Sequence, residues 1–192
     1  DWSSQMVERT RHRARDQQLA DRIATELVGA HELEKLAGDG RFDGAYSNLG
    51  PLNCVPDLAG LAAQCARLIR PGGALVFTVI GRYCPWEIAH YARLGRWRRI
   101  GVRFARGMIP VGMNGHVIWT RYHTPRQFYS AFRETFRLVH HRSVCLWAPP
   151  PYLESWAANH PRLYRAMRRA DRISAGWPVL RGLGDHFLIV MR

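Results

Sequence analysis

Two ionisable side chains lie three residues apart and have the spacing of one helical face. Glu87 and His90 occur in a segment with helical character, so both side chains can point to the same side. A carboxylate or an imidazole can take a proton from a reacting group, so either residue is a candidate general base. The alternative is that Glu87 pairs with a nearby arginine and that His90 packs at the surface. His123 and His186, at the ends of predicted elements, are weaker candidates for the same role.

A turn at the end of a predicted strand brings together a second group of polar atoms. Residues 47–50 read Ser-Asn-Leu-Gly, and Asn53 follows closely. Ligands of nucleotide-binding α/β sheets lie at the carboxyl ends of strands, which is where this turn falls. Gly50 permits close approach of the backbone, and Asn48 has both a donor and an acceptor. The alternative is an ordinary turn that ends a strand.

The segment 42–80 must position this turn, and it reads strand, turn, helix, turn, strand. The run 75–80 is apolar and β-branched, long enough for a strand covered on both faces. Pro71-Gly72-Gly73 cannot continue a helix, so the helix should end before it. A helix crossing between two parallel strands forms a βαβ unit. The apolar residues of the helix recur on one face: Leu58, Leu61, Ala62, Cys65, Leu68 and Ile69.

The remaining elements are predicted from local patterns on either side of this unit. Ser3 or Ser4 can cap a helix that runs to about Arg15. Residues 22–28 alternate as a strand, and Asn114-Gly115 between apolar runs predicts a hairpin.

The C-terminal part is predicted to hold two strands and two helical segments. Thr124-Pro125 has the cap and first-turn residues of a helix, and the helix is expected to continue to about residue 136. Strands are expected at 138–147 and 186–191, and a helical segment interrupted at Pro161 lies between them. The buried face of the first helix would consist of Phe128, Phe132 and Phe136.

Composition limits the classes of protein to which the chain can belong. A length of 192 residues with 47% apolar content fits one domain with a single core. The four cysteines form no CxxC pair, so we expect neither a disulfide framework nor a metal site. No run of about 18 uncharged apolar residues occurs, so we expect no membrane span and a cytoplasmic location.

The net charge of +13 lies entirely in the second half of the chain. Residues 1–80 hold nine basic and ten acidic residues, a balance of −1, whereas residues 81–192 hold nineteen arginines and five acidic residues, a balance of +14. Six arginines fall between Arg93 and Arg106, and five more between Arg162 and Arg172. These residues form either a solvated face or a field that attracts an anionic partner, such as a phosphorylated substrate, an acidic carrier, a membrane surface or a nucleic acid.

The order and spacing of several short motifs resemble the class I S-adenosylmethionine-dependent methyltransferases, of the type 11/25-like group. The motifs are Phe42-Asp43-Gly44, Asn48-Leu49-Gly50 with Leu52-Asn53, and the run 68–73. Residues 1–7, 124–136, 138–147 and 184–190 are similar to further parts of that fold. The resemblance implies an α/β, Rossmann-like sheet with helices on both faces. It also implies that the first strand and its glycine-rich loop are lacking, and that helical and hairpin insertions follow the fifth strand.

The resemblance further implies S-adenosylmethionine as the cofactor. Asp1 would accept hydrogen bonds from the ribose hydroxyls, and Trp2 would lie against the adenine. At the position of an acid that binds the adenine amino group in many members, this chain has Gly29, so either Glu32 or the backbone would take that role. The expected cofactor residues are Asp1, Trp2, Ala30, His31, Glu32, Asn48, Leu49, Gly50 and Asn53.

The same resemblance divides the chain into one incomplete domain, residues 1–192. Residues 1–80 would form the cofactor-binding half, and 81–123 and 152–180 would be substrate-side insertions. Because the strand with the glycine-rich loop would precede Asp1, we expect the chain to be the C-terminal part of the enzyme and inactive or weak alone. The expected residues of the acceptor site are Arg82, Tyr83, Trp86 and Glu87.

The expected reaction is methyl transfer to a small molecule, either anionic or linked to a carrier. Nucleic-acid bases are disfavoured as acceptors. Enzymes that methylate such bases typically have a Pro-Pro-aromatic sequence at the turn that corresponds to 48–50, or a Pro-Cys pair, and this chain has neither. The alternative is a basic module without catalysis that docks on a membrane surface or an acidic partner. Trp86, Trp97 and Trp119 occur among the arginines and are compatible with contact at an interface. The methylated atom and the oligomeric state are not indicated.

Overall fold

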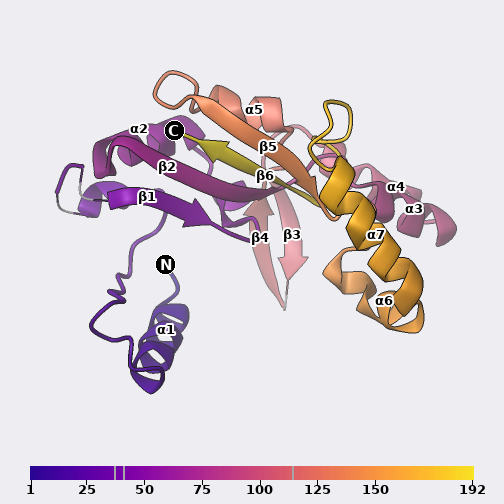
Figure 1. Cartoon of the computed structure of the whole chain (residues 1–192), viewed down its shortest axis with the longest axis horizontal. Coiled ribbons are helices and arrows are strands. Elements are labelled where there is room, and N and C mark those ends of the chain that lie inside the picture. The colour runs from indigo at the N-terminus through magenta and orange to yellow at the C-terminus, as the bar shows by residue number, and fades with distance from the viewer. Residues whose placement is uncertain (37, 41, 114) are drawn as a thin grey trace.

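The centre of the protein is a four-stranded mixed sheet, seen in the computed structural model, which describes residues 1–36, 38–40, 42–113 and 115–192 (Figure 1). Across the sheet the strand order is β1-β2-β6-β5. β1 and β2 are parallel, and β6 runs antiparallel to both of its neighbours, β2 and β5. β5 therefore runs in the same direction as β1 and β2. The strands span Phe42–Ser47 (β1), Ile69–Ile80 (β2), Leu138–Val144 (β5) and His186–Met191 (β6).

The predicted βαβ unit is confirmed, with helix α2 (Leu58–Leu68) between β1 and β2. The carboxylate of Asp57 caps α2 by accepting hydrogen bonds from two backbone N–H groups of the first turn, at 3.1 and 2.9 Å. β2 starts directly after the helix. Phe42 pairs with Ile69 and Gly44 with Ala74, so residues 70–73 bulge outward and the Pro-Gly-Gly sequence acts as an irregular turn inside the strand.

The hydrophobic core lies on one face of the sheet, against α2 and α5. The predicted burial of three phenylalanines is confirmed: Phe128 and Phe132 are fully buried and Phe136 nearly so. The ring of Phe77 on β2 meets Phe128 and Phe132 edge-on, with centroids 6.3 and 5.9 Å apart. The other strand residues on this face are Leu75, Val79, Phe187, Ile189 and Met191.

Helix α5 (Pro125–Ser130) begins as predicted but ends earlier. Thr124 and Gln127 form a capping box, in which each side chain accepts a hydrogen bond from the backbone N–H of the other residue. The predicted continuation to residue 136 is wrong. The hydroxyl of Tyr129 donates to the carbonyl of Phe136 and accepts from the N–H of Leu138, and these bonds turn the chain into β5.

The N-terminal segment confirms one prediction and contradicts another. Helix α1 (Ser4–Asp16) is capped by Ser3, whose hydroxyl accepts from the N–H of Met6 at 3.3 Å. Residues 22–28 do not form the predicted strand. Among the described residues, the only backbone bonds from this segment to another part of the chain join Glu26 and Val28 to Asp1, and two bonds are too few for a strand. In Figure 1, α1 stands apart from the sheet, below β1.

Residues 81–123 form a cap of helices and a hairpin after β2. Met113 and His116 pair at the end of the predicted antiparallel hairpin, whereas Asn114 lies outside the described residues. The elements are α3 (Pro85–Arg93), α4 (Trp97–Ile100), a short helical turn at Val102–Phe104, β3 (Ile109–Met113) and β4 (His116–Thr120).

Two helices, α6 (Glu154–Asn159) and α7 (Pro161–Ser174), follow β5 and confirm the helical segment broken at Pro161. They lie with α3 and α4 at the end of the molecule away from α1 (Figure 1). Trp86 of α3 contacts Trp156 of α6, with ring centroids 5.5 Å apart. Within the described part of the chain, no helix has the length and apolar character needed to cross a bilayer.

Candidate cofactor site and the cap over the sheet

A cavity of about 560 Å³ lies between the N-terminal segment and the open edge of β1. Small-molecule sites typically measure roughly 300 to 1,000 Å³, so this volume suits a cofactor. The lining is mostly apolar. One wall comes from β1, β2 and α2, and the other from residues 1–2, 28–31 and 33. The residues that define the two walls are Ala45, Ser47, Leu61, Cys65 and Phe77 against Asp1, Trp2, Gly29, Ala30 and His31.

Four of the predicted cofactor residues, Asp1, Trp2, Ala30 and His31, meet in this cavity. One carboxylate oxygen of Asp1 accepts a hydrogen bond from the N–H of Ser3 at 2.9 Å. The second oxygen has no protein partner among the described residues and can accept a bond from a ligand. Trp2 is 76% exposed and touches His31 edge-on, with centroids 6.0 Å apart. Most of the indole surface is therefore open to a ligand.

Glu32 does not line the cavity. Its carboxylate pairs with Lys35 in the following helical turn (Leu33–Lys35), and this hydrogen bond lowers the pKa of Glu32. Gly29, in contrast, belongs to the cavity wall. Two groups were predicted to bind the adenine amino group, the side chain of Glu32 and the backbone. The backbone near Gly29 fits this geometry better.

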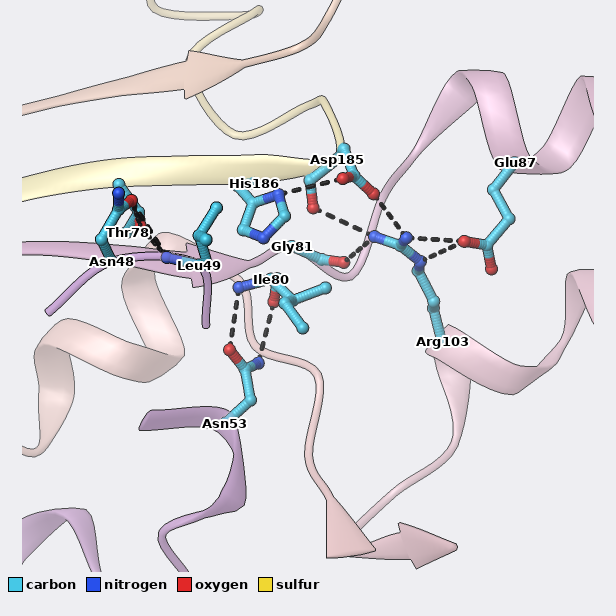
Figure 2. Close-up of polar contacts among 10 residues, drawn as sticks. All are labelled: Asn48, Leu49, Asn53, Thr78, Ile80, Gly81, Glu87, Arg103, Asp185 and His186. Atoms are coloured by element: carbon cyan, nitrogen blue, oxygen red, sulfur yellow. Dashed lines mark hydrogen bonds and ion pairs between the residues drawn. The ribbon is translucent and has the colours of Figure 1, made fainter. Parts of the chain in front are cut away.

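The turn after β1 is held rigidly against β2 (Figure 2). The hydroxyl of Thr78 donates to Asn48 Oδ1 at 2.8 Å and accepts from the N–H of Leu49 at 2.8 Å. Leu49 has a φ of 65° and its side chain is 75% exposed. A non-glycine residue in the left-handed region costs about 1 to 2 kcal/mol, and such strain recurs where ligands bind.

Gly50 has a φ of 79°, and a Cβ atom there would lie 2.5 Å from Cγ1 of Ile80. Only glycine fits this position. Asn48, Leu49 and Gly50 do not line the cavity themselves, but Ser47 and Pro51 on either side of them do. The predicted turn therefore borders the cavity rather than forming its wall.

Asn53 is fully buried in the short helix Pro51–Cys54. Its Oδ1 accepts from the N–H of Ile80 at 2.8 Å, and its Nδ2 donates to the carbonyls of Ile80 and Arg121 at 3.0 and 2.7 Å. Both amide hydrogens are thus used by the protein. Asn53 joins the turn to the end of β2 and to the segment after β4, and so acts on the cavity by positioning its neighbours.

Several cavity residues are missing from the sequence prediction. Cys54 and Val55 follow Asn53 directly, and the strand-to-helix connection after residue 48 is the signal that could have identified them. Ile118 comes from β4, far along the chain, and no local pattern connects it with the cavity.

A buried cation joins the cap to the sheet (Figure 2). Arg103 Nη2 lies 2.6 Å from Glu87 Oε2 and 2.6 Å from Asp185 Oδ1, and Nη1 donates to the carbonyls of Gly81 and Asp185, both at 3.0 Å. Burial acts to lower the pKa of Arg103, but the hydrogen bond with Glu87 and the charge of Asp185 outweigh it and raise the pKa. For Asp185, burial acts to raise the pKa, but His186 and Arg103 lower it on balance.

The candidate general bases have different surroundings. Glu87 is paired with Arg103, which was the alternative expected from the sequence. His90 packs against the rings of Tyr91 and Tyr152, with centroids 5.3 and 6.4 Å away. His186 Nδ1 lies 3.0 Å from Asp185 Oδ2.

His123 is only 3% exposed, and its ring meets Phe128 edge-on. Burial, together with the charges of Arg121 and Arg82, lowers the pKa of His123 to about 4. His123 is therefore neutral near pH 7. Its Nε2 has no hydrogen-bond partner among the described residues.

The predicted acceptor residues hold the cap together. Arg82 donates to the carbonyls of Ala105 and Tyr122 at 3.4 and 3.3 Å. Tyr83 packs on Phe104, and the indole N–H of Trp86 donates to the carbonyl of Trp147 at 3.0 Å. Together with Glu87 they build the cap after β2, and none of the four lines the cavity at β1.

Three side chains where the cap meets the start of β6 carry potential metal ligands: Cys84, Glu87 and Asp185, with ligand atoms within 4.8 Å of one another. The guanidinium of Arg103 already lies between the two carboxylates, 2.6 Å from each. Burial raises the pKa of the Cys84 thiol to about 11, so this thiol stays protonated near neutral pH. The group is therefore better suited to its own arginine than to a metal ion.

The comparisons with known proteins agree with this architecture. Residues 1–77 match the model of the methyltransferase domain family. Apart from Ile118, every residue that lines the cavity falls within the same stretch. No curated protein sequence matches the chain.

Solved structures resemble the whole chain at low sequence identity. A geranyl diphosphate C-methyltransferase from Streptomyces coelicolor A3(2) is 16% identical, with a TM-score of 0.57 over 99% of this chain and 59% of its own. An S-adenosylmethionine-dependent methyltransferase from Methanosarcina mazei is 16% identical, with a TM-score of 0.60 over 100% of this chain and 78% of its own. An S-adenosylmethionine-dependent methyltransferase from Mesorhizobium loti is 20% identical, with a TM-score of 0.56 over 100% of this chain and 77% of its own.

The chain thus spans less than two thirds of the length of the Streptomyces enzyme. Three observations agree on the fold: the antiparallel strand β6 between β2 and β5, the cavity at β1 and the family match. This chain has the fold of the class I S-adenosylmethionine-dependent methyltransferases, and its residues 1–77 match their methyltransferase domain.

Proposed function

We propose that the protein containing these residues transfers a methyl group from S-adenosylmethionine to a small-molecule acceptor. The observation that carries the proposal is the coincidence of the cavity with the family match, since both fall within residues 1–77 apart from Ile118. A carboxylate, an exposed indole and apolar walls suit a nucleoside with a ribose diol and a flat base.

Each part of the cavity has a proposed role in holding the cofactor. The free oxygen of Asp1 accepts hydrogen bonds from the ribose, Trp2 stacks on the adenine, and the backbone of residues 29–31 lines the base. The rigid turn at 48–50 lies toward the methionine end. When bound, S-adenosylmethionine supplies an electrophilic methyl group on a sulfonium.

The main task of the chain is to align the acceptor with that methyl group and to exclude water. Alignment alone can contribute roughly 7 to 11 kcal/mol to lowering a barrier. The carboxylates of Glu87 and Asp185 are engaged by Arg103, so neither is free to accept a proton. We therefore propose that neither carboxylate acts as the general base.

We propose the cap, residues 81–123, as the acceptor side of the site, and an anionic or carrier-linked acceptor. The balance of +14 in residues 81–192 supports this preference because a positive field concentrates anionic ligands. The Streptomyces relative was crystallised with geranyl diphosphate, so its fold holds an acceptor with anionic groups.

Titration calorimetry of the intact protein with S-adenosylmethionine tests the proposal. We expect saturable binding, weakened on the order of 10- to 100-fold by Asp1→Asn, because the lost carboxylate bond is charge-assisted. Asp16→Asn is the matched control, since Asp16 is an exposed carboxylate that pairs with His12 at the end of α1. Absence of binding heat would favour the alternative, a basic module without catalysis.

A further inference from the structure

Helix α7 presents an unusual concentration of positive charge to solvent. The helix has five arginines, and at 100° per residue all of them lie within an arc of about 120° around its axis. All five are exposed. The residues are Arg162, Arg165, Arg168, Arg169 and Arg172.

The opposite side of α7 is fixed to the sheet, and this fixes the direction of the arginines. The carboxylate of Asp171 accepts hydrogen bonds from the backbone N–H groups of three successive residues, 146–148, at 2.9 to 3.2 Å. Ser174 accepts from the indole N–H of Trp147 at 2.8 Å, and the carbonyl of Ala175 accepts from the N–H of Ser143 at 2.9 Å. Ser174 lies about 180° around the helix from the middle of the arginine arc, so the arginines face away from the protein.

No acidic residue balances this charge. Between residues 155 and 184 the only acidic residue is Asp171, and its carboxylate accepts hydrogen bonds from residues 146–148, which follow β5. No ion pair joins the five arginines to any carboxylate in the described part of the chain. Arg168 lies over the ring of Tyr164, 5.9 Å from its centroid, which leaves its guanidinium on the surface.

Exposed apolar side chains border the arginines at the C-terminal end of the helix. Ile173 is 61% exposed and lies about 20° from Arg162 in angle around the helix. Trp177 and Val179, in the turns that follow, are 56% and 82% exposed. We define the α7 face as the five exposed arginines of α7 with the exposed apolar residues at its C-terminal end and directly after it, Ile173, Trp177 and Val179.

We propose that the α7 face docks on the surface of an anionic lipid bilayer. The guanidinium groups would bind lipid phosphates, and the three apolar side chains would enter the interfacial region. The arginines alone would also suit a nucleic acid or an acidic protein. The large apolar side chains beside them favour a bilayer, because they gain from burial in lipid and gain little against a phosphate backbone.

Flotation of the full chain with lipid vesicles tests the proposal without any use of methyl transfer. We expect binding to vesicles of phosphatidylcholine with 30% phosphatidylglycerol, and little binding to phosphatidylcholine alone. Arg165→Gln/Arg169→Gln/Arg172→Gln should weaken vesicle binding on the order of 100-fold, since each basic residue at the surface contributes severalfold. The control is Arg9→Gln/Arg13→Gln/Arg15→Gln, which removes the same charge from exposed positions of α1 at the far end of the molecule (Figure 1).

The apolar part of the α7 face has its own test. Ile173→Ser should lower binding severalfold at 0.5 M salt, where charge attraction is screened, whereas Val139→Ser on the exposed side of β5 should not. Equal losses in the two triple variants would overturn the proposal, because net charge alone would then explain binding. Tighter binding of a 25-base-pair DNA duplex than of vesicles at the same salt would also overturn it and assign the face to a nucleic acid.

Discussion

Arg103 and Asp185 are 82 residues apart in the chain, and their side chains meet at 2.6 Å in the protein interior. Arg103 follows α4, and Asp185 directly precedes β6. Asp185, Glu87 of α3 and the carbonyl of Gly81 together accept hydrogen bonds from all five N–H groups of the Arg103 guanidinium. One guanidinium thus connects a helix of the cap with the start of β6.

Replacement of Arg103 by Met should therefore destabilise the protein strongly. The substitution leaves Glu87 and Asp185 buried without a counter-charge, and loss of one partner of a buried pair costs about 3 to 5 kcal/mol. The free energy of unfolding from denaturant titration measures the effect. Arg106→Met, at an exposed arginine three residues away, is the control and should change stability by less than about 0.5 kcal/mol.

Neutralising the carboxylates should relieve much of this loss. We expect Glu87→Gln/Asp185→Asn in the Arg103→Met background to recover part of the stability, because the uncompensated charges are gone. If Arg103→Met were as stable as Arg106→Met, the guanidinium would not join cap and sheet as described.

Gly50 and Gly72 allow the cost of a clash to be separated from the cost of backbone strain. Both have a positive φ, 79° and 78°, but a Cβ at Gly50 would lie 2.5 Å from Ile80 Cγ1, whereas at Gly72 it would meet nothing within 4 Å. Gly72→Ala should cost about 1 kcal/mol from strain alone. Gly50→Ala should cost about 2 to 3 kcal/mol more, because overpacking adds to the strain.

Thermal unfolding of the two glycine variants gives the comparison, and S-adenosylmethionine titration extends it. Because residue 50 lies between the cavity residues Ser47 and Leu52, Gly50→Ala should also weaken cofactor binding, and Gly72→Ala should not. Equal unfolding temperatures would show that Ile80 moves aside without cost.

Local patterns in the sequence were sufficient for elements whose contacts are close in the chain. The α2 stripe, a serine cap at residue 3 or 4, the helix start at Thr124-Pro125 and the three core phenylalanines follow from spacing and capping chemistry. The strand at 22–28 failed because alternation of side chains does not provide a pairing partner. The early end of α5 depends on one hydroxyl, that of Tyr129, which no helical period reveals.

The candidate site was predictable only in part. Asp1, Trp2, Ala30 and His31 were identified by resemblance and do share a cavity. Glu87 was identified by its spacing with His90, but its partner Arg103 could not be, since the pairing depends on how the cap folds back. Ile118 was missed for the same reason.

Asn53 should be essential for the shape of the turn. Asn53→Ala removes one acceptor and two donor bonds to Ile80 and Arg121 in a fully buried position, and we expect a loss of about 2 to 4 kcal/mol. Asn48→Ala is the control, because Asn48 is exposed and should cost less than about 1 kcal/mol. Urea titration measures both. A loss for Asn53→Ala no larger than the control would mean that water replaces its bonds.

His123 should make stability depend on pH in a defined window. Its pKa is about 4 in the folded protein, against an ordinary value of 6.5, so the unfolded chain binds the proton more readily. The contribution of His123 to stability is therefore complete above pH 6.5 and is lost as pH falls toward 4, on the order of 3 kcal/mol in all. The lowered pKa of Asp185 acts in a separate window, below its ordinary value of 3.8.

The measurement is the free energy of unfolding at several pH values for wild type and His123→Leu. Because Nε2 of His123 has no hydrogen-bond partner in the described part of the chain, leucine should leave stability at pH 8 nearly unchanged and flatten the profile between pH 6.5 and 4. A smaller slope should remain from His141, whose pKa is lowered by burial and by Arg181. His116→Leu, at an exposed position on β4, should retain the wild-type slope. An unchanged slope in His123→Leu would show that another group controls the acid side of the profile.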